Sequence, residues 1–228
     1  MLIYIIRHGE TDMNKESVLQ GHTDIPLNQS GRDLAAVTGR EMRDIRFDAC
    51  ISSPLSRALE TAEIVLRESG HAIAYENGET GGDTDSDRVV PLTLDERIME
   101  MNCGEWELRK LSEMGEEAVR LFTFDPFNFP QFPGGEDFHD VRDRAQDFLN
   151  ELMARDDDKN YLVATHGCAL RAMLNPFYDD PDNFWHDHVP YNCCVNIIEA
   201  HGGKGKLIAD DKVYYPRELI VDRYKYEK

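Results

Sequence analysis

Two short apolar runs, each followed at once by His-Gly, constrain the fold of this chain most. Residues 2–6 read Leu-Ile-Tyr-Ile-Ile and lead into Arg7-His8-Gly9, and residues 161–165 read Tyr-Leu-Val-Ala-Thr and lead into His166-Gly167. Short runs rich in β-branched and aromatic residues are typical of buried strands, as in parallel sheets. We therefore predict two strands that deliver His8 and His166 at their C-terminal ends, where α/β sheets bind ligands.

The segments between and after these runs alternate between helical and strand patterns. Further strands are predicted at residues 47–52, 195–200 and 206–209, the last two forming a hairpin across Gly202-Gly203. Helices are predicted at residues 28–43, 57–67, 111–124, 138–155 and 169–175, with Asn28 as an N-cap. With no internal repeat and no domain boundary, the pattern predicts one domain over residues 1–228, a three-layer α/β/α sandwich with a mostly parallel central sheet.

Two stretches are predicted to lack regular structure. Residues 78–88 are acidic and glycine-rich, which is typical of a surface loop. Residues 122–133 contain five phenylalanines among three prolines, a composition that disfavours helices and strands. We predict that residues 105–137 form a lid-like insertion over the C-terminal strand ends. Its phenylalanines suit either a small satellite core or a contact surface for an apolar leaving group, and we favour the core.

The charge of the chain excludes several classes of partner. The net charge is -19 and the pI about 4.7, so the surface repels polyanions, and neither nucleic acid nor an anionic membrane is an expected partner. No apolar stretch approaches the ~20 residues that a membrane span needs. The N-terminal apolar run is short and has no basic segment before it, unlike a signal peptide. We expect a cytoplasmic protein in which any phosphate site is a local basic pocket.

The cysteines and one histidine pair are the candidates for redox or metal sites. The chain has five cysteines, an odd number without a C-x-x-C pair, which indicates reduced and mostly buried thiols. His186-Asp187-His188 offers metal-ligating side chains, but adjacent residues on an extended segment point to opposite sides, so a solvated loop is the favoured interpretation. We expect neither a metal nor another cofactor.

Four cationic or proton-carrying side chains converge in the predicted fold. Arg7, His8 and His166 lie at strand ends, and Arg57 lies in a first helical turn, where free N–H groups and the helix dipole also favour a phosphate. Neutral imidazole attacks phosphorus without the repulsion that an anionic nucleophile meets. Two guanidiniums and an imidazolium can hold the phosphoryl oxygens. The pattern therefore indicates phosphoryl transfer.

Five motifs, spread over most of the chain, carry a family resemblance. In chain order they are Arg7-His8-Gly9-Glu10-Thr11, Ser53-Pro54 with Arg57 and Thr61, Glu100 with Gly104-Glu105-Trp106-Glu107, Gly134-Gly135-Glu136, and His166-Gly167. In order and content they resemble the motifs of the histidine phosphatase superfamily, the phosphoglycerate mutase-like enzymes. The chain departs from the common pattern at Leu108, where relatives often have Gly, and at Val18, where many have Arg.

The resemblance implies a role for each site residue. His8 would be the nucleophile that becomes phosphorylated, and Glu100 would be the general acid and then the base. Without the resemblance, a surface carboxylate near a turn would be the favoured interpretation of Glu100. The other implied site residues are those that hold the phosphoryl oxygens, Arg7, Arg57 and His166, and those that line the pocket in relatives, Asn14, Gln20 and Gly21.

Three functions are compatible with these motifs: a metal-independent phosphomonoester hydrolase with a phosphohistidine intermediate, a cofactor-dependent phosphoglycerate mutase, and a catalytically silent phosphate-binding regulatory protein. Silence is disfavoured because every residue that the mechanism needs is present. Mutases of this family hold a doubly anionic intermediate with extra basic residues, whereas residues 121–133 contain no Lys or Arg and Glu100 is followed by Met101-Asn102-Cys103. A phosphatase for a small-molecule phosphomonoester is predicted. Its physiological ester and its oligomeric state, a homo-oligomer among the options, are left open.

Overall fold

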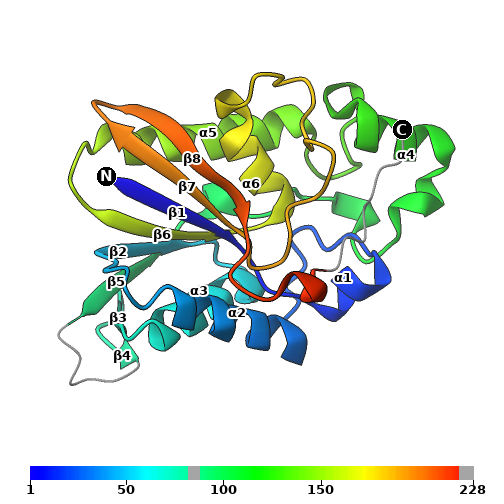
Figure 1. Ribbon diagram of the computed structural model, residues 1–228. Helices are drawn as coiled ribbons and strands as arrows, with labels where there is room; N and C mark the ends of the chain where they lie inside the picture. The colour runs from blue at the N-terminus through cyan, green and yellow to red at the C-terminus, as the bar shows by residue number, and fades with distance from the viewer. Residues whose placement is uncertain (82–87, 221–228) are drawn as a thin grey trace.

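The computed structural model describes residues 1–81 and 88–220, which fold around one sheet of eight strands (Figure 1). Across the sheet the strands are β4 (Thr80–Gly81), β3 (Ala72–Tyr75), β5 (Val89–Leu94), β2 (Ala49–Ser52), β6 (Asn160–Thr165), β1 (Leu2–Arg7), β7 (Val195–His201) and β8 (Lys204–Lys212). From β3 to β1 all neighbours are parallel, and β4, β7 and β8 are antiparallel at the two margins. This mixed, mostly parallel sheet confirms the predicted fold class.

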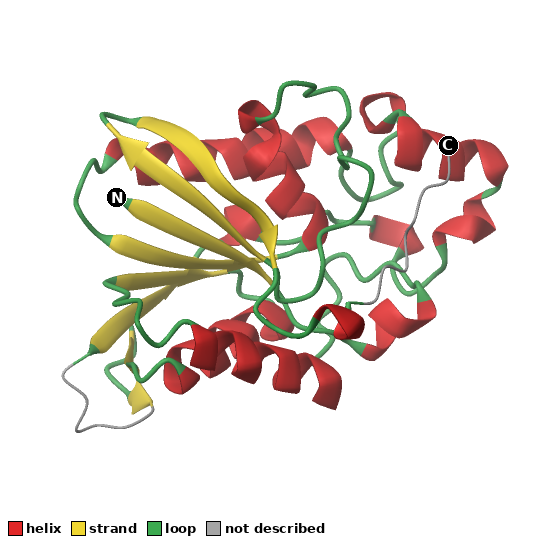
Figure 2. Cartoon of the chain, in the orientation of Figure 1, coloured by secondary structure: helices red, strands yellow, loops and turns green. Residues whose placement is uncertain are grey.

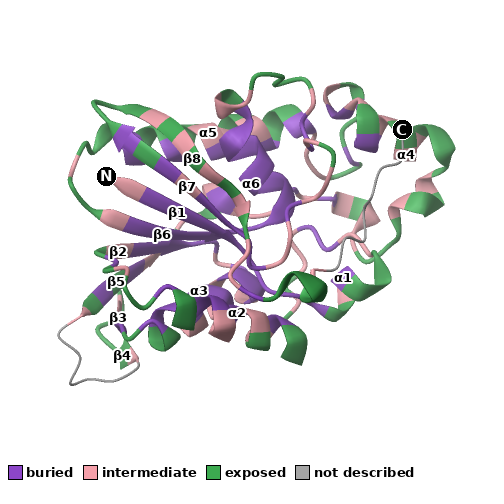
Figure 3. Cartoon of the chain, in the orientation of Figure 1, coloured by how far each residue is buried: buried purple, intermediate pink, exposed green. Residues whose placement is uncertain are grey.

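Helices cover both faces of the sheet (Figure 2). α2 (Gln29–Glu41) and α3 (Ser56–Glu68) lie on one face, and α5 (Phe138–Ala154) and α6 (Gly167–Leu174) lie on the other. Because side chains alternate along a strand, Ile3 and Ile5 of β1 pack in the core on the α5 side, whereas Tyr4 and Ile6 pack with α2 and α3. Buried residues follow the central strands and the whole of α6 (Figure 3). The three predicted layers are present.

Local capping signals explain where the helices begin. The Asn28 side chain accepts a hydrogen bond from the Gly31 N–H and starts α2, and Asp137 caps α5 in the same way. The predicted helix 111–124 is wrong in one respect: it is divided into the 3₁₀ turn η3 (Leu111–Met114) and α4 (Glu116–Phe124). Gly115 lies between them with φ of 93°, which a helix cannot continue through. α6 begins directly after His166, earlier than predicted.

Besides the two-residue β4 within the predicted loop 78–88, two strands of the sheet were not predicted, β3 and β5. Both are short, and β5 contains Pro91, a residue that argues against a strand in any local pattern. Pairing with neighbours establishes them, for example Ile73 of β3 opposite Val90 of β5. Thr80–Gly81 of the predicted loop 78–88 forms β4. Residues 82–87 of that loop lie outside the described residues.

The segment between β5 and α5, in which the predicted insertion 105–137 lies, contains η1 (Glu96–Ile98), η2 (Gly104–Trp106), η3, α4 and η4 (Pro126–Asn128). Phe129 and Phe132 are buried and belong to the same core as Phe138 of α5, so they do not form a separate satellite core. A tertiary contact joins this segment to the main core: the Phe129 and Phe138 rings pack edge to face with their centroids 6.1 Å apart.

The remaining short elements are α1 (Asp12–Glu16), η5 (Asn175–Phe177) and η6 (Arg217–Leu219). Within residues 1–81 and 88–220, no helix is long and apolar enough to cross a membrane. The five cysteines are buried and form no disulfide, as predicted.

Candidate active site

His8 follows β1 and lies at the C-terminal edge of the sheet. The ring is buried, and its Nδ1 lies 2.6 Å from the Gly9 carbonyl oxygen. A carbonyl can only accept, so Nδ1 carries the proton and Nε2 keeps its lone pair. Burial, reinforced by the positive charges of Arg7 and Arg57, lowers the pKa of His8 well below 6.5. The ring is therefore neutral at pH 7, with a free nitrogen.

Gly9 is required by close packing rather than by a turn. A Cβ at Gly9 would lie 2.6 Å from the Gly31 carbonyl oxygen of α2, closer than any real side chain can approach. The Gly9 N–H also donates to Thr61 Oγ1 of α3 at 2.9 Å. Two helices thus hold the backbone beside His8, which keeps the imidazole in one position.

Two buried guanidiniums flank His8. Arg7 donates from Nη1 to the Pro190 carbonyl, and Arg57, fully buried in the first turn of α3, donates to the carbonyls of Thr23 and Gly21 at 3.0 and 2.8 Å. Burial lowers the pKa of Arg57 to about 10, so the group stays cationic at pH 7. The Nε groups of Arg7 and Arg57 are buried without a partner among the described residues. Buried cationic donors of this kind fit an anion such as a phosphoryl group.

His166 is the residue directly before α6 and lies near His8, with the ring centroids 5.2 Å apart. Its Nε2 lies 2.7 Å from Ser53 Oγ, and its Nδ1 is buried without a partner in the part of the chain that the structure describes. Burial and, to a smaller extent, the positive charge of Arg57 lower the pKa of His166 well below 6.5. The ring is neutral at pH 7, so the expected imidazolium is not supported. His166 is not among the residues that line the pocket described below.

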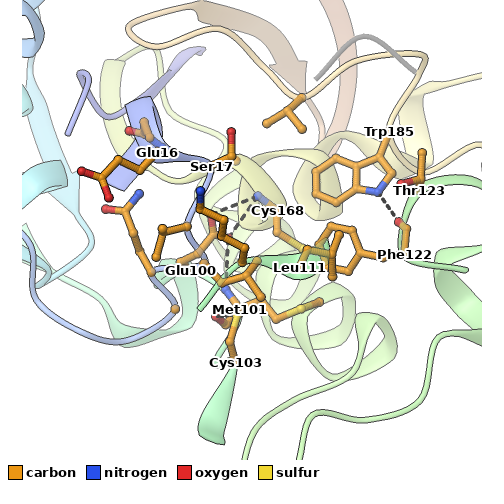
Figure 4. Close-up of a pocket in the computed structure, with 18 of the residues that line it drawn as sticks. Glu16, Ser17, Glu100, Met101, Cys103, Leu111, Phe122, Thr123, Cys168 and Trp185 are labelled. Atoms are coloured by element: carbon orange, nitrogen blue, oxygen red, sulfur yellow. Dashed lines mark hydrogen bonds between the residues drawn. The ribbon is translucent and has the colours of Figure 1, made fainter. Parts of the chain in front are cut away.

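Glu100 lies in the loop between η1 and η2, across the pocket from β1. Its carboxylate accepts the backbone N–H groups of Met101 and Cys168 at 3.0 Å each (Figure 4), and that of Ala169 at 3.3 Å. The last two are the free N–H groups at the start of α6. They fix the carboxylate at the wall of the pocket.

Arg144 of α5 holds the backbone on either side of Glu100. It donates to the carbonyls of Met99 and Glu100 at 2.7 and 2.9 Å and forms an ion pair with Glu136. This role of Arg144 was not predicted, because an arginine within an amphipathic helix, here one of two in α5, carries no signal of its target. Glu136 was expected only as part of a motif.

A single pocket of about 450 Å³ brings most of the predicted site residues together. Arg7, His8, Arg57 and Glu100 line it, and so do the three residues expected from the resemblance, Asn14, Gln20 and Gly21.

Further lining residues were not anticipated: Glu16, Lys110, Leu111, Val119, Trp185 and Val189. They come from segments whose local patterns give no sign that they meet.

Glu107 supports the phosphoryl end of the pocket without lining it. Its carboxylate accepts the N–H groups of His22 and Thr23 at 2.7 and 2.8 Å. The same loop presents the Gly21 and Thr23 carbonyls to Arg57. Gly21 has φ of 51°, which disfavours other residues, and a Cβ there would lie 2.2 Å from Glu107 Oε1 and displace this carboxylate. Glu107 therefore holds the loop that holds Arg57.

Comparisons with known proteins agree with this geometry. The model of the histidine phosphatase superfamily (branch 1) matches residues 3–210. A protein from Erwinia tasmaniensis named probable phosphoglycerate mutase GpmB is 27% identical over 199 residues, 86% of this chain and 84% of that protein.

Two solved structures show the same fold. YhfR from Bacillus stearothermophilus is 31% identical with a TM-score of 0.78, covering 93% of this chain and 97% of that one. A phosphoserine phosphatase mutant from Entamoeba histolytica in complex with phosphoserine is 22% identical with a TM-score of 0.72, covering 91% and 95%. At that identity the second resemblance shows the fold alone.

Proposed function

The chain belongs to branch 1 of the histidine phosphatase superfamily, and on that premise we propose that it is a metal-independent phosphomonoester hydrolase with a phosphohistidine intermediate on His8. One observation carries the proposal. The Gly9 carbonyl fixes the His8 proton on Nδ1, so Nε2 carries the lone pair, and the same pocket is lined by two buried guanidiniums whose Nε–H groups have no partner among the described residues. This arrangement pairs a neutral nucleophile with an anion site.

The first half of the reaction transfers the phosphoryl group to the protein. His8 Nε2 forms a bond to phosphorus as the ester P–O bond breaks, and Glu100 gives a proton to the leaving oxygen. Arg7 and Arg57 stabilise the charge that develops on the equatorial oxygens, and the neutral ring of His166 lies next to His8, with the ring centroids 5.2 Å apart. The alcohol then leaves the pocket.

The second half returns the protein to its starting state. Glu100, now ionised, takes a proton from a water molecule as that water attacks phosphorus. The N–P bond breaks, its electron pair returns to His8 Nε2, and inorganic phosphate leaves. Each step uses only side chains of this chain, so the proposal assigns no role to a metal.

The mutase function is less well supported, although curated relatives carry that name. A mutase must retain a bisphosphorylated intermediate, which needs cations at both ends of the pocket. Among the described lining residues, the cation besides Arg7 and Arg57 is Lys110, which is exposed and shares the pocket with the carboxylate of Glu16. A second anionic group would therefore be weakly held.

A chase of the phosphoenzyme tests both parts of the proposal. With ³²P-labelled phenyl phosphate in EDTA, we expect acid-labile, base-stable label on the wild type and on His201→Ala, an exposed control, and none on His8→Ala. Chased with excess 3-phosphoglycerate, the label should appear in inorganic phosphate. Label on His8→Ala, or a requirement for a divalent metal, would refute the phosphohistidine hydrolase. Label recovered mainly in bisphosphoglycerate would establish the mutase.

A further inference from the structure

Beyond His8, the pocket is walled by apolar side chains from three segments that are distant in the sequence. Leu19 follows α1, three residues come from the insertion, and two come from the loop after η5: Leu19, Leu111, Val119, Phe122, Trp185 and Val189. The full pocket, about 450 Å³, lies within the ~300–1,000 Å³ range of pockets that bury most of a drug-sized ligand. It has room for much more than a phosphoryl group.

The aromatic part of this wall is rigid and has no spare polar atom. Trp185 Nε1 donates to the Phe122 carbonyl at 2.8 Å, and the two rings lie side by side with centroids 5.5 Å apart (Figure 4). Behind them, Phe122 packs edge to face on Phe129 and Phe138 at 5.4 and 5.2 Å. Because the indole N–H is already used, Trp185 offers the pocket only its ring. A ligand therefore meets a preformed apolar surface.

The charges of the pocket are concentrated at the phosphoryl end. Away from Arg7 and Arg57, the described lining residues provide Lys110 and Glu16, both exposed and of opposite sign. A carboxylate or a second phosphate placed against the apolar wall would lose its hydration and find as a cation only the exposed Lys110 among the described lining residues there, with the carboxylate of Glu16 in the same pocket. An apolar group placed there loses only unfavourable contact with water.

We propose that this wall is a subsite for the leaving group and that the preferred substrates are phosphate monoesters with an aromatic or branched aliphatic body. The inference rests on the proposed hydrolase function and deepens it. Phe122 is the lid phenylalanine that contacts this subsite, while Phe129 and Phe132 are buried in the core. Selectivity comes from the joint wall of the insertion and the loop after η5, not from the phenylalanine-rich segment alone.

Three esters test the subsite: phenyl phosphate, 1-naphthyl phosphate and 3-phosphoglycerate. The two aryl esters have leaving groups of similar acidity and differ by one apolar ring. We expect kcat/KM to be about tenfold higher for the naphthyl ester than for the phenyl ester. The second ring adds apolar area to the leaving group, and burying such area in a pocket that fits it raises kcat/KM by about this factor. Phosphate release from 3-phosphoglycerate should be at least about a hundredfold slower than from 1-naphthyl phosphate, because its carboxylate finds no buried partner.

Leu111→Asp and a matched control separate the subsite from general effects. Leu111 lines the pocket, whereas Leu108 of the same insertion is 52% exposed and does not. Leu111→Asp should bring the naphthyl-to-phenyl ratio close to one, and Leu108→Asp should leave it unchanged. A wild-type ratio near one, or 3-phosphoglycerate as the best ester, would overturn the subsite while phosphoenzyme formation upheld the hydrolase. Failure to form a phosphoenzyme with any ester would instead refute the proposed function.

Discussion

Two buried histidines at equivalent strand ends differ in how their ring nitrogens are used. In His8 the Gly9 carbonyl occupies Nδ1 and leaves Nε2 for a ligand, whereas in His166 Ser53 Oγ lies against Nε2 and Nδ1 has no partner in the described chain. Both rings are neutral at pH 7 because burial lowers their pKa. The same residue type thus offers a nucleophilic lone pair in one place and a neutral imidazole in the other.

The protonation state of His8 gives a prediction at this scale. Burial and the charges of Arg7 and Arg57 disfavour the imidazolium, so the ring should stay neutral as the pH falls through 6.5, the ordinary value. Ring ¹⁵N chemical shifts, assigned with His8→Ala, should show the Nδ1–H tautomer unchanged from pH 8 to 6. A titration centred at or above pH 6.5, or an Nε2–H tautomer, would contradict the proposed nucleophile.

At the scale of elements, short loops after the strands form the site, and contacts between them set its geometry. The loop 21–23 lies between two charged side chains. Glu107, just past η2, accepts hydrogen bonds from its N–H groups, and Arg57 of α3 donates to its carbonyls. A movement of the insertion would therefore change the position of a guanidinium in the phosphoryl pocket. We therefore predict that Glu107 is a positioning residue, which acts through Arg57 and not on the substrate.

A double-mutant cycle tests this coupling. We expect Glu107→Gln to lower kcat/KM by about tenfold or more, since small displacements of a charge-stabilising group cost this much. In an Arg57→Ala background the same change should have almost no further effect, because the group that it positions is gone. Glu105→Gln, an exposed neighbour, is the control. Equal losses in both backgrounds, in proteins with matched melting temperatures, would show that Glu107 merely stabilises the fold.

At the scale of the whole molecule, buried neutral histidines tie stability to pH. Besides His8 and His166, His71 is almost fully buried, accepts the Phe47 N–H at Nε2 and has Ser69 Oγ 3.0 Å from its Nδ1. Burial, aided by the nearby charge of Arg88, lowers its pKa to about 4. The unfolded chain binds these protons near pH 6.5 and the folded chain does not. Stability is therefore complete above pH 6.5 and declines as the pH falls toward 4.

The His71 contribution can be isolated. With a folded pKa of about 4, it corresponds to about 2 kcal/mol of unfolding free energy lost between pH 7 and pH 5. Urea unfolding should show that His71→Gln, although less stable than the wild type at pH 7, loses about 2 kcal/mol less over this interval. His201→Gln, whose side chain is 98% exposed, should keep the wild-type dependence. If the unfolding free energy of His71→Gln and of the wild type fell equally between pH 7 and pH 5, the contribution assigned to His71 would be disproved.

Local sequence patterns are sufficient to predict the central strands, most helices and the residues at the strand ends. The run before His8 and the run before His166 are apolar over their whole length, and caps such as Asn28 and Asp137 mark helix starts within a few residues. Periodicity and capping depend on neighbours along the chain, so one sequence contains them. For the same reason the amino-acid sequence alone is enough to place the two histidines and the charge of Arg57 at one edge of the sheet.

Tertiary structure alone decided the features that depend on partners far along the chain. β3 and β5 exist because they pair with each other and because β5 also pairs with β2. Pro91 lies within β5, so no local pattern predicts that strand. The contact of Glu107 with the loop before α2 and the meeting of Trp185 with Phe122 join residues more than sixty positions apart. A one-dimensional pattern carries no record of such contacts, because burial and long-range packing select them when the sheet and its helices close. The position of His8 at the end of a buried strand was therefore predictable from the sequence, and the shape of the pocket that it lines was not.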